Sequence, residues 1–318
     1  MYAQSTIGIT GRNDTSYTTW SAYKNTVKTH PYIQIVTPVT SLAVAEKRNL
    51  VYQTIGARQS RIDAFYPAVK TNSKRVAVIF IHGGGWRSGN KAQHHPLAQQ
   101  LAALGYVCFT PEYRLSTEAL YPAALHDLKV AVRWVRTQAE TFHIDTSKIA
   151  IAGFSAGGTL ATLLGTTNGQ KEFETFLNVT NSSSNANAII NIDGTLSFVH
   201  PESGEGDDRK KTSAATYWFG YSRKENETLW RQASPLTHVS AATPPTLFIN
   251  SNMARMHAGR EDFIKVLQQN KIYHEVKTFA DAPHSFPLFH PWFEPTVQTI
   301  DAFLRKVFAP EQNVSNPF

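Results

Sequence analysis

The pentapeptide Gly153–Gly157, GFSAG, is the feature that most constrains the fold of this chain. Residues 148–152, KIAIA, are short and apolar, which is typical of a buried strand, and residues 158–164, GTLATLL, read as a helix. A strand, a sharp turn and a helix around G-x-S-x-G form a nucleophile elbow, where side chains in place of the two glycines would clash with neighbouring backbone. The pattern predicts a reactive Ser155; the alternative is a glycine-rich turn with a passive serine.

A second glycine-rich segment follows another predicted strand. Residues 76–81, VAVIFI, form a continuous apolar run, as expected of a strand that is buried on both faces. The run ends in His82–Trp86, HGGGW. Glycines in such a loop let backbone N–H groups approach a substrate carbonyl and hold the oxyanion that develops there. A phosphate-binding loop is the alternative, but no G-K-[ST] follows.

A histidine near the end of the chain completes this order of motifs. Residues 273–279, YHEVKTF, alternate like a strand and lead into residues 281–286, DAPHSF. A histidine in the loop after the last strand, later in the chain than the serine, is the expected general base. We therefore predict that His284 takes the proton of Ser155. His290 is the competitor, and its apolar surroundings favour a packing role.

The carboxylate of a Ser-His-acid triad has no obvious position. Residues 245–250, PTLFIN, predict a strand, but residues 251–260 carry no carboxylate. Glu261 and Asp262 come next, in the first turn of a predicted helix, where the helix dipole alone would favour acids. Asp193 ends the apolar run 188–192 and is a further candidate. We predict Asp262 first, with Asp193 and Glu261 as alternatives; the acid would orient the imidazole.

The order of elements predicts an α/β fold. Strands alternate with helices, which indicates a mostly parallel central sheet with helices on both faces. Two antiparallel strands are expected at residues 48–55 and 61–68, ahead of the parallel part. Residues 1–40 are polar and predict an N-terminal arm, followed by a single domain over residues 41–318. A cap-like insertion is expected at about residues 198–235, between the sixth and seventh strands.

Composition excludes several classes of protein. The formal net charge is +7, but the longest basic run, Arg209–Lys211, follows a cluster of acids, which gives nucleic-acid binding little support. No segment approaches the ~18–20 apolar residues of a membrane-spanning helix. Cys108 is the single cysteine, so the chain has no disulfide framework or thiolate metal cluster. We expect a secreted or periplasmic protein whose signal peptide has been removed, with a cytoplasmic protein as the alternative.

Taken together, the motifs resemble the α/β-hydrolase superfamily over about residues 45–309. The HGGGW loop, with YRL at 113–115 and YPA at 121–123, resembles the hormone-sensitive-lipase and feruloyl-esterase branches. Four later segments resemble secreted bacterial carbohydrate esterases: NIDG at 191–194, HPES at 200–203, RMHAGR at 255–260 and HPWFEP at 290–295. The resemblance implies a serine esterase with Ser155 as nucleophile, His284 as base, oxyanion donors at Gly84, Gly85 and Ala156, and no cofactor or metal.

The same resemblance implies a substrate class. It favours esters of plant cell-wall polysaccharides such as pectin or xylan, with acetyl esters first and methyl esters second. The alternatives are a general carboxylesterase on small acyl esters and a non-catalytic binding protein with a hydrolase fold.

The residue types at positions 255–260 also suggest a binding role independently of the resemblance. They lie at the carboxyl edge of the predicted sheet, where open α/β folds bind ligands. Because arginine pairs with carboxylates, Arg255, His257 and Arg260 are candidate contacts to a uronic acid. The alternative is that an arginine pairs with Glu261 or Asp262 and pins the loop. Trp86 either stacks on a sugar ring or packs in the core.

Overall fold

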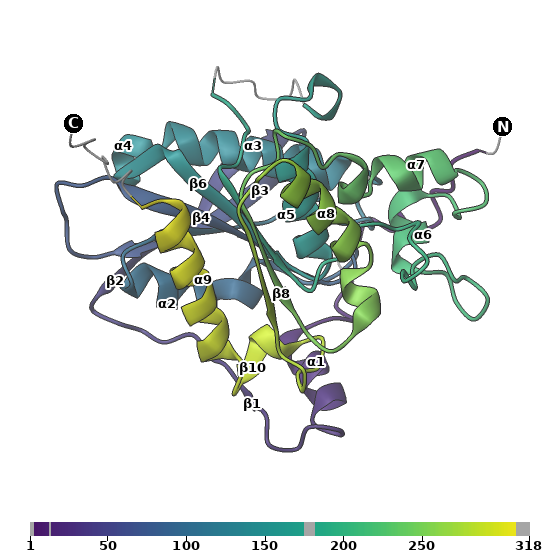
Figure 1. Cartoon of the computed structure of the whole chain (residues 1–318), viewed down its shortest axis with the longest axis horizontal. Coiled ribbons are helices and arrows are strands. Elements are labelled where there is room, and N and C mark those ends of the chain that lie inside the picture. The colour runs from purple at the N-terminus through teal and green to yellow at the C-terminus, as the bar shows by residue number, and fades with distance from the viewer. Residues whose placement is uncertain (1–2, 13, 175–181, 310–318) are drawn as a thin grey trace.

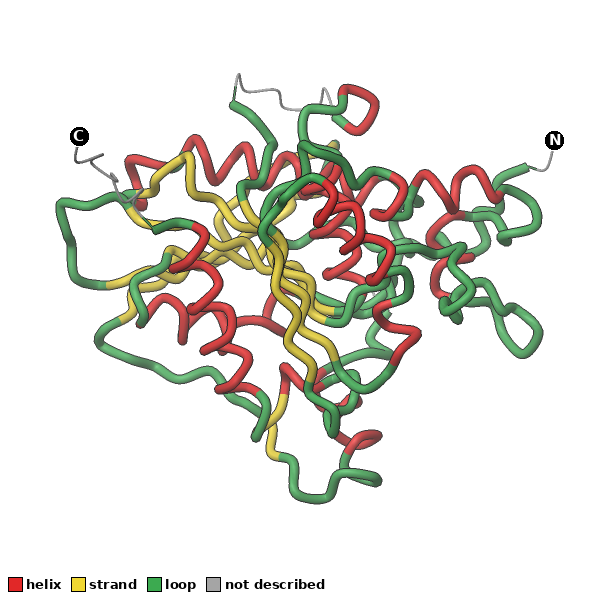
Figure 2. Tube along the Cα trace, viewed as in Figure 1, coloured by secondary structure: helices red, strands yellow, loops and turns green. Residues whose placement is uncertain are grey.

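A computed structural model describes residues 3–12, 14–174 and 182–309 of the chain. Its centre is an eight-stranded sheet with the strand order β2-β3-β5-β4-β6-β7-β8-β9 (Figures 1 and 2). In this order, all strands from β5 through β4 to β9 run parallel. At the other edge, β3 pairs antiparallel with β5, and β2 pairs antiparallel with β3. The strands are β2 (Val44–Ile55), β3 (Arg58–Pro67), β4 (Arg75–Ile81), β5 (Val107–Pro111), β6 (Ile144–Phe154), β7 (Ala188–Ile192), β8 (Thr246–Asn250) and β9 (His274–Thr278). The predicted α/β-hydrolase arrangement, a mostly parallel sheet with helices on both faces, is confirmed.

Helices cover both faces of this sheet (Figure 1). One face carries α3 (Ala123–Thr137), α4 (Ala139–Phe142), α5 (Ala156–Thr166) and α8 (Arg260–Gln269), and the other carries α2 (His95–Ala103) and α9 (Phe293–Val307). Residues 91–103 form two helical elements, because Pro96 begins an α-helix well but cannot continue one. A 3-10 turn, η1 (Lys91–His94), therefore precedes α2.

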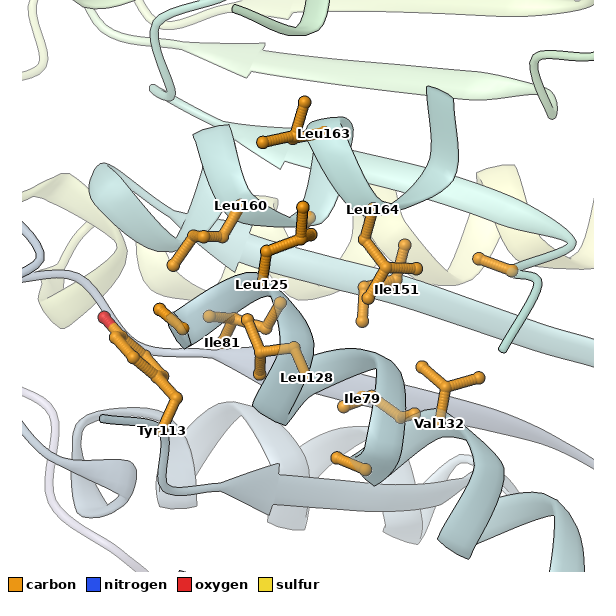
Figure 3. Packing of buried hydrophobic residues seen from close by; sticks show 14 of the residues in the cluster. Ile79, Ile81, Tyr113, Leu125, Leu128, Val132, Ile151, Leu160, Leu163 and Leu164 are labelled. Carbon is orange, nitrogen blue, oxygen red and sulfur yellow. The ribbon is translucent and has the colours of Figure 1, made fainter. Parts of the chain in front are cut away.

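The core explains why the apolar strands read as continuous runs. Successive residues of β4 point to opposite faces, so Ile79 and Ile81 pack under α3 and α5 while Val78 and Phe80 pack under α2 and α9. Figure 3 shows the first of these layers, in which leucines at helical spacing on α3 and α5 meet the isoleucines of β4 and β6. Burial on both faces explains why residues 76–81 of β4 and 149–152 of β6 are all apolar.

The N-terminal arm follows the carboxyl edge of the parallel strands. Its polar sequence did not predict helix α1 (Thr19–Thr26) or strand β1 (Gln34–Ile35), which pairs with β10 (Phe289–His290). The contacts between the arm and the domain near that edge include three of interest: Ser5 N donates to Gly220 O, Asp14 pairs with Arg87, and Tyr17 OH lies 3.3 Å from Ser285 Oγ. These contacts place the arm beside the loops that follow β4 and β9.

The stretch expected to form an insertion lies between β7 and β8. It contains α6 (Ala214–Phe219), α7 (Glu227–Gln232) and the 3-10 turn η3 (Pro235–Thr237), beyond the carboxyl end of the sheet (Figure 1). Its buried aromatic residues, Phe198, Trp218, Phe219 and Trp230, join the core cluster of α3 and α5. No helix in the described ranges is long and apolar enough to cross a membrane.

Candidate active site

Ser155 stands in the turn between β6 and α5 with a backbone geometry that serine rarely adopts. Its φ and ψ are 56° and −123°, and strain of this kind persists only where the surroundings enforce it. A Cβ on Gly153 would lie 2.1 Å from Gly157 O, and a Cβ on Gly157 would lie 2.1 Å from Ile81 O. The backbone N–H of Ser155 also donates to Ile192 O at 2.8 Å. The turn is thus held by β4 and β7, and both glycines are required by contact.

His284 lies between the serine and a buried carboxylate. Its Nε2 is 2.9 Å from Ser155 Oγ, and its Nδ1 is 2.9 Å from Asp193 Oδ2. A carboxylate oxygen can only accept, so Nδ1 carries the proton of the neutral ring and Nε2 accepts from the serine hydroxyl. The geometry is that of a base positioned to remove the serine proton.

Asp193 is fully buried at the carboxyl end of β7, with φ at 51°. Its Oδ1 accepts from Ser251 N at 2.8 Å, and its Oδ2 accepts from Ser251 Oγ at 2.5 Å as well as from His284. Asn250 Nδ2 lies 3.5 Å from Oδ1. A buried charge is tolerated only where its oxygens are hydrogen-bonded, and here donors from β8 and the histidine loop meet that need.

The prediction of Asp262 as the acid is wrong. Asp262 is half-exposed in the first turn of α8, where it accepts from Lys265 Nζ at 2.7 Å and lies 3.5 Å from His200 Nε2. The alternative Glu261 pairs with Arg260. Strand order explains the correction: β7 is hydrogen-bonded to β6, so Asp193 ends one strand away from Ser155.

The HGGGW loop presents backbone N–H groups beside the serine. A Cβ on Gly83 would lie 3.1 Å from Ser155 Cβ, and Gly83 N donates to Gln93 Oε1 at 2.7 Å. Gly84 and Gly85 have φ of 124° and 61°, and a Cβ on Gly84 would lie 2.2 Å from Ser88 O. Within the described residues, the N–H groups of Gly84, Gly85 and Ala156 have no protein acceptor. These three donors are therefore available to an oxyanion.

His82, the first residue of that loop, has a structural environment. Its ring stacks on Tyr113 with 4.4 Å between centroids, and Tyr113 OH donates to His82 O at 2.9 Å. Burial lowers the pKa of His82 to about 4, so the ring is neutral at pH 7 and its Nδ1 donates to Gly83 O. The competitor of His284, His290, lies in β10 and pairs with Glu294.

Trp86 is only 4% exposed and stacks on Trp218, with 4.8 Å between ring centroids and 5° between planes. Of the two roles considered for it, the structure favours packing. The stack joins the oxyanion loop to the insertion, and Ala214 of α6 fills the space beside Gly85, 3.1 Å from where a Cβ would stand. The insertion therefore forms one wall of the site.

The positive charges proposed to bind a uronate are partly offset by carboxylates of the chain. Arg260 donates to Asn250 Oδ1 at 2.7 Å and pairs with Glu261, which is the pinning role considered above. Arg255 is exposed and lies beside Gly204. Burial raises the pKa of Glu205, and the positive charge of Arg255 opposes this rise. His257 is half-buried, and burial, followed by Arg260, lowers its pKa.

Sequence reasoning gave no role to Ser251 or Tyr17. Ser251 directly follows β8, and the register of β7 and β8 pairs Ile192 with Ile249. The position of Ser251 at the end of the strand next to β7 was the one sign that it could reach Asp193. Tyr17 reaches the histidine loop from a polar arm that carries no motif. Among the described residues, no group of three or more His, Cys, Asp or Glu side chains is arranged to hold a metal ion.

Comparison with curated proteins finds esterases of Mycobacterium tuberculosis. The chain is 28% identical over 249 residues to Esterase LipC, which aligns 72% of this chain with 58% of that protein. It is 29% identical over 255 residues to the probable carboxylic ester hydrolase LipM, with 76% and 56% of the two chains covered. The chain thus spans somewhat more than half the length of these relatives.

Solved structures share the fold over most of the chain. A carbohydrate esterase from gut microbiota superposes with a TM-score of 0.70 at 19% identity and covers 84% of this chain and 99% of that one. A thermophilic esterase of Thermogutta terrifontis with butyrate bound gives a TM-score of 0.68 at 25% identity and covers 85% and 97%. The BD-FAE family model matches residues 62–256, from β3 through the elbow and Asp193 to the loop after β8. That match spans well over half of the sequence, and the chain therefore belongs to the BD-FAE family.

Proposed function

We propose that this protein is a serine carboxylic-ester hydrolase. The observation that carries the proposal is the pair of 2.9 Å contacts that link Ser155 to His284 and His284 to Asp193. Ser155 Oγ attacks the ester carbonyl as its proton passes to His284 Nε2, and Asp193 stabilises the imidazolium. The oxyanion accepts from the N–H groups of Gly84 or Gly85 and of Ala156.

The second half of the reaction reverses the proton transfers. The C–O bond of the tetrahedral intermediate breaks, and the alcohol leaves with the proton held by His284. Water then adds to the acyl-enzyme and gives its proton to His284. The bond between the acyl carbon and Ser155 Oγ breaks, Ser155 Oγ takes that proton from His284, and the acid is released. No step of this sequence calls on a metal or cofactor.

The substrate that we propose is an acetyl ester on a plant cell-wall polysaccharide or oligosaccharide, with methyl esters as the second choice. A gut carbohydrate esterase of the same fold supports this class. The charges around the site favour a neutral sugar such as xylose over a uronate, because Arg260 is already paired and Glu205 stands beside Arg255. We also propose that the enzyme acts outside the cytoplasm, which fractionation of cells that produce it would test.

A general carboxylesterase on small acyl esters is the second candidate. The relatives named as esterases and the butyrate-bound structure are equally consistent with it. A non-catalytic binding protein has less support, because such a protein has no need to hold Ser155 in a strained turn against a histidine.

Analysis of released products tests the proposal. Purified protein is incubated with acetylated xylan, pectin and p-nitrophenyl esters, and acetate, methanol and ferulate are measured. Acetate from xylan is expected, and Ser155→Ala should abolish its release. Turnover of p-nitrophenyl acetate and butyrate without any product from polysaccharide would favour the general carboxylesterase. Undiminished turnover by Ser155→Ala would exclude the mechanism.

A further inference from the structure

A polar cavity of about 260 Å³ lies beside the oxyanion loop. Its walls come from the N-terminal arm, from the oxyanion loop and from the loop that follows β5. It therefore lies at the carboxyl edge of β4 and β5, where open α/β sheets bind their ligands. None of the residues assigned to the triad or the oxyanion hole lines it.

The cavity is nonetheless adjacent to both halves of the reaction centre. His82 forms part of its wall, and the next residue, Gly83, lies against Ser155 with 3.1 Å between the two Cβ positions. Tyr17 forms another part, and its hydroxyl lies 3.3 Å from Ser285 Oγ, one residue after His284. A group bound in the cavity would thus be close to a substrate held at the serine.

Two polar residues of the wall, one partly buried and one exposed, keep hydrogen-bonding capacity that the protein does not use. Glu112 Oε2 accepts from Arg61 N at 3.1 Å, but within the described ranges its Oε1 has no hydrogen bond and its charge no cationic partner. Asn90 is an exposed residue whose Oδ1 accepts from Ala92 N at 2.9 Å, while its amide nitrogen has no acceptor in those ranges. The other charged groups of the wall are paired: Arg58 with Glu118, and Asp14 with Arg87.

These features define the ligand chemistry. A carboxylate acceptor and an amide donor suit a hydroxyl, which needs both, and the wall also includes Tyr17 and Tyr113. The volume falls just below the ~300–1,000 Å³ of sites for drug-sized ligands, so a single ring fits better than an extended chain. The unpaired charge of Glu112 disfavours a uronate. We infer that this cavity is a subsite for one neutral sugar unit of the saccharide whose ester reacts at Ser155.

The inference rests on the proposed function, and its test separates the two. Glu112→Gln keeps an acceptor for Arg61 N, and Asn90→Asp keeps an acceptor for Ala92 N, so both variants should fold. Glu140→Gln is the matched control, since Glu140 is exposed on α4 just ahead of β6, at the opposite edge of the sheet. The measured quantity is kcat/KM on acetylated xylo-oligosaccharides divided by kcat/KM on p-nitrophenyl acetate. We expect this ratio to fall roughly tenfold in each cavity variant and to stay unchanged in the control.

A binding measurement gives a readout that does not depend on turnover. Calorimetric titration with unacetylated xylotriose should show binding that Glu112→Gln weakens roughly tenfold. Ratios and affinities within twofold of the parent protein in both folded variants would overturn the subsite, as would tighter binding of trigalacturonate than of xylotriose. Absence of p-nitrophenyl acetate turnover, with xylotriose binding intact, would instead count against the proposed esterase and leave the subsite supported.

Discussion

The nucleophile elbow and the site of the acid lie on neighbouring strands, yet they are encoded in different ways. At the elbow, the constraint is on the backbone: Gly153 and Gly157 have no room for a Cβ. At the end of β7, the constraint is a set of hydrogen bonds between Asp193 and Ser251, which are 58 residues apart. A backbone constraint leaves a local motif, whereas a side-chain network between distant segments leaves none. Substitutions in the two regions should therefore have different consequences.

Between these two regions, the largest expected effect on catalysis is that of Asp193→Asn. Asparagine tolerates the positive φ of 51° at this position, so the backbone should be kept. The groups around the carboxylate donate to it, so an amide N–H₂ would face a donor in either orientation. The histidine would no longer be held in the tautomer with its proton on Nδ1. We therefore expect kcat on p-nitrophenyl acetate to fall by about 10⁴, the size of the effect of the same change in a serine protease.

Asp262→Asn is the matched control for that experiment. Asp262 is a half-exposed residue paired with Lys265, so its neutralisation should change kcat by less than about twofold, since exposed pairs contribute little. A large loss in this variant, with Asp193→Asn nearly unaffected, would show that His284 takes its acid from α8 in solution. That result would reverse the contrast between the two regions.

Gly157→Ala should damage the fold, where Asp193→Asn should damage only the chemistry. A methyl group 2.1 Å from Ile81 O cannot be accommodated unless β4 and α5 separate. We expect the free energy of unfolding to fall by about 3 kcal/mol or more, measured by urea denaturation. Gly169→Ala is the control. The φ of Gly169 is +71°, but nothing lies within 4 Å of the added Cβ, so the free energy of unfolding should fall only by the roughly 1–2 kcal/mol that left-handed strain costs. Equal losses in the two variants would mean that contact does not enforce the elbow.

Much of the fold could be predicted because it is encoded locally. The two-sided burial of β4 produces the run VAVIFI, and the lack of space for a Cβ at Gly153 and Gly157 produces the G-x-S-x-G motif. Strand β1 has only two residues and exists because β10 pairs with it, so no periodicity could have revealed it. The prediction of the acid failed for the same reason, because its position depends on contacts between distant segments. The usual position of the acid, a few residues after β8, holds no carboxylate, and only the hydrogen bonds of Asp193 with Ser251 and His284 distinguish it from Asp262.

Two buried histidines beside the oxyanion loop should make the stability of the protein sensitive to acid. Burial lowers the pKa of His82 to about 4 and that of His94 to about 3, while the unfolded chain takes up protons at the ordinary value of 6.5. The unfolded state therefore binds more protons below pH 6.5, so stability is full above that pH and falls as the pH drops toward 4. His82 alone contributes a loss of up to about 3 kcal/mol.

Replacement of His94 isolates its part of this effect. His94→Phe retains an aromatic ring beside Phe80 and Phe154 but cannot titrate. The difference in the free energy of unfolding between pH 7 and pH 4.5 should be smaller in this variant than in the parent protein. A pH dependence that is the same in both proteins would show that His94 is protonated in the folded state.

The smallest effect tests how firmly the acid is held. Ser251→Ala removes the hydroxyl that donates to Asp193 Oδ2 but keeps the backbone N–H that donates to Oδ1, so His284 loses orientation and not its partner. We expect kcat to fall roughly tenfold with KM unchanged, the cost of one hydrogen bond to a charged group, and Ser251→Thr to restore most of the loss. Ser240→Ala, in a loop ahead of β8, should have no effect. If Ser251→Ala lowers kcat as much as Asp193→Asn does, the network as a whole holds the acid; if it lowers nothing, Asp193 is fixed by its backbone alone, and the two regions differ less than their sequences suggest.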